Sequence, residues 1–188
     1  MANTTSLDGR HIIVGLTGGI ACYKVAYVVS KLVQQGASVQ VLMTESAAKF
    51  MTPLTFSSLT GRAVFDTQWC FVDGHDPQHI RIAKKADAML IAPCTMNMLA
   101  KLAHGMTDDP VSLVASAVDR GKSPVLLAPS MNATMLEQPC TQRNLKILAE
   151  DGFSVLGSVE GWQACKTIGK GRMAEPTTLL DALKAALE

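Results

Sequence analysis

The stretch HIIVGLTGGIACYKVAYVVSKLVQQG, residues 11–36, contains the strand, turn and helix from which the fold of this chain can be predicted. Its first part, His11–Leu16, is a short run of mainly β-branched and apolar residues that is typical of a buried strand. Two glycines follow, and the apolar residues of Ile20–Gln35 recur at helical spacing. Gly36 is then placed to end the helix. This order of elements opens a doubly wound α/β domain.

Three more strands are predicted at Ser38–Met43, Ala88–Ala92 and Pro124–Ala128. The last two are nearly continuous in apolar character, as in a parallel sheet that helices cover on both faces. A short strand is expected near Ser154–Leu156 and a last helix from Thr177. The helical patterns between the strands are Thr95–Ala103, Pro110–Asp119 and Thr141–Glu150. We therefore predict one α/β domain over residues 1–188, with a Rossmann-like or flavodoxin-like parallel sheet.

The composition excludes several classes of protein. The formal net charge is +1, which leaves no electrostatic footprint for nucleic acid. No apolar run approaches the roughly 20 residues of a membrane span, and the N-terminus lacks the pattern of a secretory signal. The histidines lack metal-ligand spacing, so no metal is expected. The cysteines are odd in number and scattered, which predicts a reducing, cytoplasmic location. They are Cys22, Cys70, Cys94, Cys140 and Cys165.

Small polar residues and glycines follow each of the four main predicted strands. In a doubly wound sheet, ligands bind beyond the carboxyl ends of the strands. The segments there are Thr17–Ile20, Thr44–Ser46, Pro93–Asn97 and Pro129–Thr134. They contain neither a complete GxGxxG nor a P-loop pattern. Taken singly, each hydroxyl or amide also fits the cap of a helix. Together they favour a small phosphorylated cofactor.

The segment Gly161–Pro176, GWQACKTIGKGRMAEP, is rich in glycine and basic residues. Its glycines make it a poor helix and a poor strand, so it is expected to be a loop. It carries a thiol at Cys165 and cations at Lys166, Lys170 and Arg172. One interpretation is a flap, residues 161–176, that closes on an anionic substrate. The other is a solvated surface loop with an incidental thiol.

Five motifs occur in a fixed order from about Arg10 to Pro176. They are TGGIACYK (17–24), HIRIAKKAD (79–87), PCTMNM (93–98), PSMNATML (129–136) and the segment 165–175. In this order the motifs resemble those of the homo-oligomeric flavin-containing cysteine decarboxylases. The first resembles the flavin-phosphate loop of that family, the third its PASANT box and the fourth its PxMNxxMW box. The last is similar to the flap motif GxxCGxxGxGRMxE, and His79 occupies the place of the active-site histidine.

The chain departs from the family motifs at a few positions. Leu136 stands where Trp is usual, and Lys166 where Gly is usual after the cysteine. A glycine at the latter position can adopt a positive φ, which a lysine rarely does. The PASANT box keeps its hydroxyl at Thr95 and its amide at Asn97. Its substituted positions are Cys94, Thr95, Met96 and Met98.

The resemblance implies an FMN-dependent carboxy-lyase of coenzyme A biosynthesis that converts 4′-phosphopantothenoylcysteine into 4′-phosphopantetheine. The substrate thiol is oxidised to a thioaldehyde, CO₂ is lost, and the enethiol is reduced again. By position in the motifs, His79 is the acid/base, Asn132 binds the substrate carboxylate through its NH₂ group, and Cys165 is the proton donor.

The motif positions also imply which residues bind each ligand. The expected substrate-binding residues are Asn132, Lys170, Arg172 and Met173, with Lys166, Lys170 and Arg172 as candidates for the substrate phosphate. The expected FMN-binding residues are Gly18, Gly19, Ile20, Thr44, Ser46, Thr95, Asn97, Ser130 and Met131. The family further implies a homotrimer, or a dodecamer of trimers, with FMN at the subunit interface and His79 supplied in some cases by a neighbour.

Other functions fit parts of the same pattern. A peptidyl-cysteine decarboxylase of lantibiotic maturation shares the FMN, His79 and Asn132, but performs only the oxidative half and needs no flap cysteine. A non-catalytic regulatory binding protein would usually carry acidic or low-complexity extensions, and a flavin prenyltransferase would not need the MNxxM box. In many bacteria the decarboxylase is fused to the ligase that makes its substrate, and the sequence leaves open whether a ligase domain belongs here.

Overall fold

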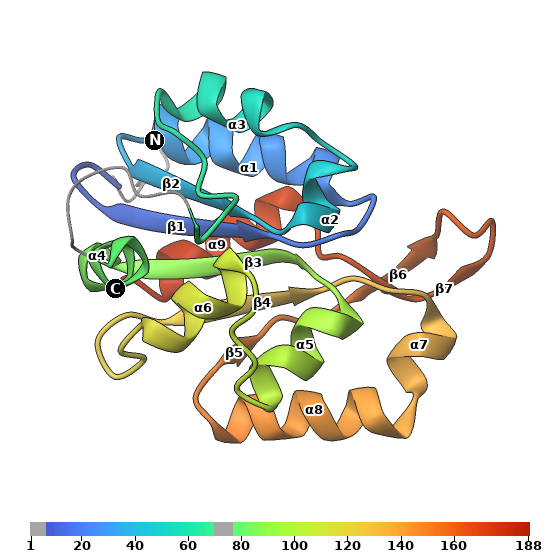
Figure 1. Cartoon of the computed structure of the whole chain (residues 1–188). Coiled ribbons are helices and arrows are strands. Elements are labelled where there is room, and N and C mark those ends of the chain that lie inside the picture. The colour runs from blue at the N-terminus through green and yellow to red at the C-terminus, as the bar shows by residue number, and fades with distance from the viewer. Residues whose placement is uncertain (1–6, 70–76) are drawn as a thin grey trace.

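The computed structural model describes residues 7–69 and 77–188, so Cys70 and the first six residues, which entered the expectations above, lie outside the described residues. Within these ranges five parallel strands form a central sheet in the order β2-β1-β3-β4-β5 (Figure 1). The strands are β1 (His11–Leu16), β2 (Ser38–Met43), β3 (Ala88–Cys94), β4 (Val125–Pro129) and β5 (Ser154–Val155). The predicted fold class is thereby confirmed.

Helices cover both faces of this sheet, because alternate residues of each central strand point to opposite sides. Ile12 and Val14 of β1 pack into one core with α1, α3 and α9, whereas Ile13 packs into a second core with α4, α5 and α6. The helices are α1 (Cys22–Gln34), α2 (Glu45–Ala48), α3 (Pro53–Thr60), α4 (Gln78–Lys85), α5 (Met96–Ala103), α6 (Pro110–Ala117), α7 (Ala133–Glu137), α8 (Pro139–Glu150) and α9 (Pro176–Ala185). In the part of the chain that the structure describes, no helix has the length and apolar character to cross a membrane.

The predicted loop at 161–176 is wrong in its local structure. The segment contains most of an antiparallel hairpin made of β6 (Val159–Trp162) and β7 (Ile168–Arg172). Glycines in β7 are needed because other parts of the chain come very close to them, and they do not make the segment irregular. A Cβ on Gly171 would lie 2.4 Å from the carbonyl oxygen of Met131, and one on Gly169 would lie 3.0 Å from the Cβ of Ala133. The missing side chains therefore allow β7 to pack against Met131, which follows β4, and against α7 (Figure 1).

Candidate active site

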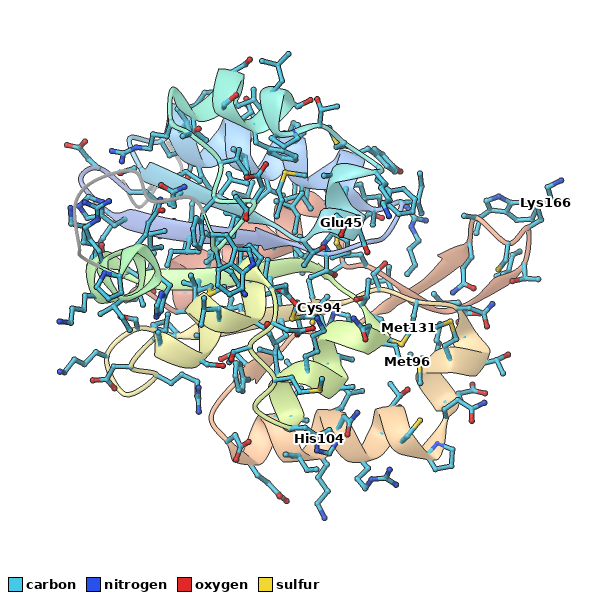
Figure 2. All side chains as sticks on the ribbon, in the orientation of Figure 1. Glu45, Cys94, Met96, His104, Met131 and Lys166 are labelled. Carbon is cyan, nitrogen blue, oxygen red and sulfur yellow. The ribbon has the colours of Figure 1, made fainter. Side chains whose placement is uncertain are left out.

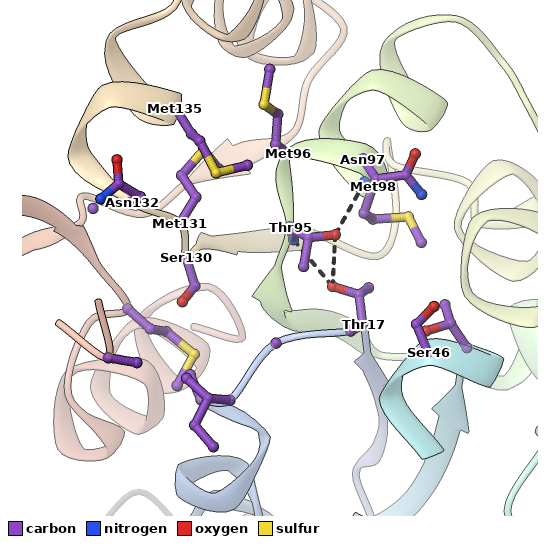
Figure 3. A pocket seen from close by; sticks show the side chains of 18 of the residues that line it. Thr17, Ser46, Thr95, Met96, Asn97, Met98, Ser130, Met131, Asn132 and Met135 are labelled. Atoms are coloured by element: carbon purple, nitrogen blue, oxygen red, sulfur yellow. Dashed lines mark hydrogen bonds between the residues drawn. The ribbon is translucent and has the colours of Figure 1, made fainter. Parts of the chain in front are cut away.

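A cavity of about 870 Å³ lies at the carboxyl ends of β1, β3 and β4 (Figure 3). This is the edge at which a doubly wound sheet binds its ligands. The loop Gly18–Ala21 before α1 lines it, and so do the starts of α2, α5 and α7. The hairpin contributes Trp162–Cys165 and Gly171–Arg172 from the other side. The cavity thus joins the first and last motifs of the chain.

The floor of the cavity is a set of contacts between the exits of β1 and β3. The hydroxyl of Thr17, which is buried, accepts a hydrogen bond from the backbone N–H of Thr95 at 3.1 Å and lies 3.2 Å from the Thr95 hydroxyl (Figure 3). A Cβ on Gly18 would lie only 2.5 Å from the Cβ of Ser46, so this loop must carry glycine to lie against α2. The sequence places Thr17 directly after the first predicted strand but indicates no separate role for it.

Three polar residues of the cavity wall cap helices. Thr44 accepts from the N–H of Ala47 at 3.1 Å, and Thr95 accepts from the N–H of Met98 at 3.3 Å. Asn132 caps α7 in the same manner. From the sequence alone, helix capping and ligand binding were alternative roles for these residues. The structure shows the caps and places the same residues on the cavity wall. Both α1 and α5 begin beside the cavity. The free N–H groups and the positive dipole end of each helix N-terminus favour an anion there.

The cations that line the cavity already have carboxylate partners. Lys24 lies 3.0 Å from Glu175, and Arg172 lies 2.6 Å from the same carboxylate. The Lys24 ammonium, and after it the nearby charges, lower the pKa of Glu175. Lys101 is similarly held by Asp108 at 2.7 Å and by Asp109 at 2.8 Å. An anion in this cavity would therefore meet backbone N–H groups and hydroxyls as well as cations that are already paired with carboxylates.

Asn132 and Cys165 come together at the hairpin. Because Oδ1 of Asn132 accepts from the N–H of Thr134 at 2.9 Å, its NH₂ group points the other way and lies 3.3 Å from the sulfur of Cys165. The exposed thiol also lies 3.0 Å from the hydroxyl of Thr167. Hydrogen bonding by Thr167, and then by Asn132, lowers the pKa of the Cys165 thiol. A thiol and an amide donor thus lie side by side on the cavity wall.

Most of the residues predicted for the site line this one cavity. They are Gly18, Gly19, Ile20, Thr44, Ser46, Thr95, Asn97, Ser130, Met131, Asn132, Cys165, Arg172 and Met173. Lys170 does not line it, and neither does His79. His79 lies on α4, which precedes β3 and so sits at the far, amino end of that strand (Figure 1). The sequence gave no role to Lys24, Lys101 or Gln163, which also line the cavity.

Comparison with known proteins places this site in a family. A family model described as "Flavoprotein" matches residues 1–188, and the chain belongs to that family. Over 183 residues it is 42% identical to the coenzyme A biosynthesis bifunctional protein CoaBC of Haemophilus influenzae, an alignment that covers 94% of this chain and 44% of the relative. The chain therefore spans less than half the length of that curated relative.

Solved structures with the same fold agree with this assignment. A PPC decarboxylase mutant in complex with pantothenoylaminoethenethiol has a TM-score of 0.83 at 26% identity, covering 94% of this chain and 97% of that one. The FMN-dependent cysteine decarboxylase SpaF has a TM-score of 0.81 at 28% identity, covering 96% and 97%. The resemblance to flavin-containing cysteine decarboxylases, first drawn from five motifs, is confirmed.

Proposed function

We propose that the chain is an FMN-dependent carboxy-lyase that converts 4′-phosphopantothenoylcysteine into 4′-phosphopantetheine in coenzyme A biosynthesis. The observation that carries this proposal is the 3.3 Å contact between the Asn132 amide and the Cys165 thiol on the wall of the cavity. The amide suits a carboxylate that is to leave, and the thiol suits a carbon that is to be protonated. The similarity to a PPC decarboxylase and to a CoaBC protein supports the same reaction.

The residues around the cavity fit FMN. Gly18 and Gly19 line the cavity and carry no side chains, so the backbone of the first loop is open to a phosphate. The hydroxyls and amides at the strand exits would hold the rest of the cofactor, with Thr95 and Asn97 on one side and Ser130 on the other. When bound, FMN takes two electrons from the CH₂–SH group of the substrate and later returns them.

The residues of the chain then account for the remaining chemistry. The Asn132 NH₂ group donates to the substrate carboxylate, which leaves as CO₂ after the thiol has been oxidised to a thioaldehyde. The electrons of the broken C–C bond remain in the enethiolate. In the reductive half, Cys165 gives its proton to carbon. The net change replaces the carboxylate by one hydrogen, with no net oxidation.

His79 and the basic residues of the hairpin complete the proposal. His79 acts as the acid/base, and because it lies away from the cavity of its own chain, a second copy supplies it in a homotrimer or a larger assembly of trimers. Arg172 takes the substrate phosphate, since it lines the cavity. Lys170 has a weaker claim, because it does not. A cytoplasmic location stays a prediction.

The second candidate is a peptidyl-cysteine decarboxylase, and the similarity to SpaF favours it. Such an enzyme would perform the oxidative half alone and would have no use for a thiol beside Asn132. The position of Cys165 therefore favours the first candidate. A non-catalytic binding protein would need neither group.

The Cys165→Ser variant tests the choice. A serine hydroxyl is a far weaker acid than a thiol, so this variant should still oxidise and decarboxylate the substrate but should fail to protonate the enethiol. Mass spectrometry is expected to show a product two hydrogens lighter than phosphopantetheine, and the absorbance of oxidised flavin should bleach. Formation of ordinary phosphopantetheine at the wild-type rate would make Cys165 a bystander and would reopen the second candidate.

A further inference from the structure

Gln163 is a buried amide in a hairpin whose neighbouring side chains are exposed. It is 8% exposed, whereas Trp162 beside it is 63% exposed and Cys165 also faces solvent. An amide removed from water is costly unless its donors and acceptor find partners. The proposed reaction gives Gln163 no role, so its contacts indicate what it does.

Two carbonyl groups fix the orientation of the Gln163 side chain. Its Nε2 donates to the carbonyl oxygen of Lys170 at 2.8 Å and lies 3.5 Å from that of Met131. Because a carbonyl oxygen only accepts, the NH₂ end of the amide must face these two groups. The Oε1 end must then point the other way. It lies 3.5 Å from the Asn132 NH₂ group and 3.5 Å from the sulfur of Cys165.

The amide of Asn132 is oriented in the same way. The backbone N–H of Thr134 occupies its Oδ1, so its two N–H bonds face the hairpin. Their nitrogen lies 3.5 Å from Oε1 of Gln163 and 3.3 Å from the sulfur of Cys165. Backbone groups therefore fix which end of each amide faces the other. The carbonyl groups of Met131 and Lys170 orient Gln163, and the N–H of Thr134 orients Asn132.

We propose that Gln163 is a positioning residue that holds the Asn132 amide against Cys165. Its Oε1 accepts from the Asn132 NH₂ group and keeps that group facing the thiol. The substrate carboxylate of the proposed function would bind at the same place. The assignment of these two groups to decarboxylation rests on the proposed function, but their arrangement does not. A test of the arrangement therefore needs no substrate.

The test measures how fast iodoacetamide alkylates Cys165 as a function of pH, by mass spectrometry of the peptide that contains it in the purified full chain. Gln163→Glu places a carboxylate beside the thiol, and Gln163→Met removes the acceptor without adding charge. Gln163→Met should move the midpoint of the profile to higher pH, because an Asn132 amide that is no longer held stops donating to the thiolate. The loss of Oε1 alone, which accepts from the Cys165 thiol, would move the midpoint to lower pH. Gln163→Glu should raise the midpoint further, because the thiolate also meets a like charge. At pH 8 the rate should fall on the order of fivefold in Gln163→Glu and by less in Gln163→Met.

Gln142→Glu is the matched control, since Gln142 makes a comparable bond to the carbonyl oxygen of Leu136 but contacts neither Asn132 nor Cys165. Its profile should equal that of the wild type. The variants leave unchanged the charged groups of the hairpin and of α7, namely Glu137, Glu160, Lys166, Lys170 and Arg172.

A hairpin that is merely loosened would also raise the limiting rate at high pH, where the thiol is fully ionised, whereas the loss of the Asn132 donor alone should move only the midpoint. A midpoint in Gln163→Met that is unchanged or moves to lower pH would overturn the positioning role. The Cys165→Ser product decides the proposed function separately, so either conclusion can fail without the other.

Discussion

Lys166 occupies the tip of the β6–β7 hairpin with a φ of 64° (Figure 2). It is the residue that stands where the related motif has glycine, and the structure shows why glycine is usual there. A left-handed conformation costs an L-residue roughly 1–2 kcal/mol, because its Cβ crowds the following carbonyl group. The chain keeps a strained tip three residues from Gln163 and next to Cys165.

Lys166→Gly should relieve this strain, whereas Lys166→Val should increase it. The backbone N–H of Gln163, which donates to the carbonyl oxygen of Thr167 at 2.9 Å, reports the opening of the tip. Its hydrogen exchange should slow by a few-fold in the glycine variant and accelerate in the valine variant, since about 1 kcal/mol corresponds to roughly fivefold. The opposite order of the three rates would contradict the account of strain.

Thr167→Val should move the pH dependence of the reductive half. The Thr167 hydroxyl lowers the pKa of Cys165, so its removal raises that pKa toward the ordinary thiol range. In the proposed function Cys165 must be protonated to donate, and a higher pKa keeps it protonated to higher pH. The alkaline limb of the rate of enethiol reduction should therefore shift upward in Thr167→Val and stay in place in Thr167→Ser. A downward shift would show that the hydroxyl does not stabilise the thiolate.

At the level of elements, the central strands and α1 were predictable because their apolar residues follow simple periods. The short helices α2 and α7 span 4 and 5 residues and are too short for a period to appear, although Thr44 and Asn132 marked their starts. The hairpin was missed because glycine is rare in strands, and the reason for these glycines lies in the distant Met131 and Ala133. Local signals could not show such contacts.

Gly18→Ala tests the cofactor loop at this level. A Cβ there would lie 2.5 Å from the Cβ of Ser46, so either the loop or α2 must move. FMN affinity should fall by about tenfold or more, because the phosphate would lose aligned backbone donors. Gly157→Ala is the control, since nothing lies within 4 Å of its added Cβ. Flavin absorbance per chain and an FMN titration measure the effect. Full flavin content in Gly18→Ala with unchanged affinity would contradict the placement of the phosphate.

For the whole molecule, the sequence predicted many of the residues that line the cavity but not how they meet. Thr17 meets Thr95 and Gln163 meets Asn132 only because the sheet order and the hairpin bring distant segments together. Three exposed apolar side chains lie on α1 or just before it. Ile20 and Tyr23 line the cavity, and Tyr27 lies one helical turn beyond Tyr23. Such a surface suits burial by another copy and supports the proposed oligomer.

Mixing two inactive variants tests whether His79 acts across a subunit interface. In the proposed function His79→Asn removes the acid/base and Asn132→Asp sets a like charge against the substrate carboxylate, so each alone should lose about 10²–10⁴-fold in rate. If each site takes Asn132 from one chain and His79 from its neighbour, randomly mixed assemblies hold about one quarter of sites with both natural residues, one half times one half. Co-expression with two different tags, followed by tandem purification, should therefore restore a substantial fraction of wild-type activity. Each variant purified by itself and the two mixed without subunit exchange serve as controls and should stay inactive. Mixed assemblies of confirmed mass that remain as inactive as their parents would place His79 and Asn132 in the same chain's site and would remove the neighbour from the mechanism.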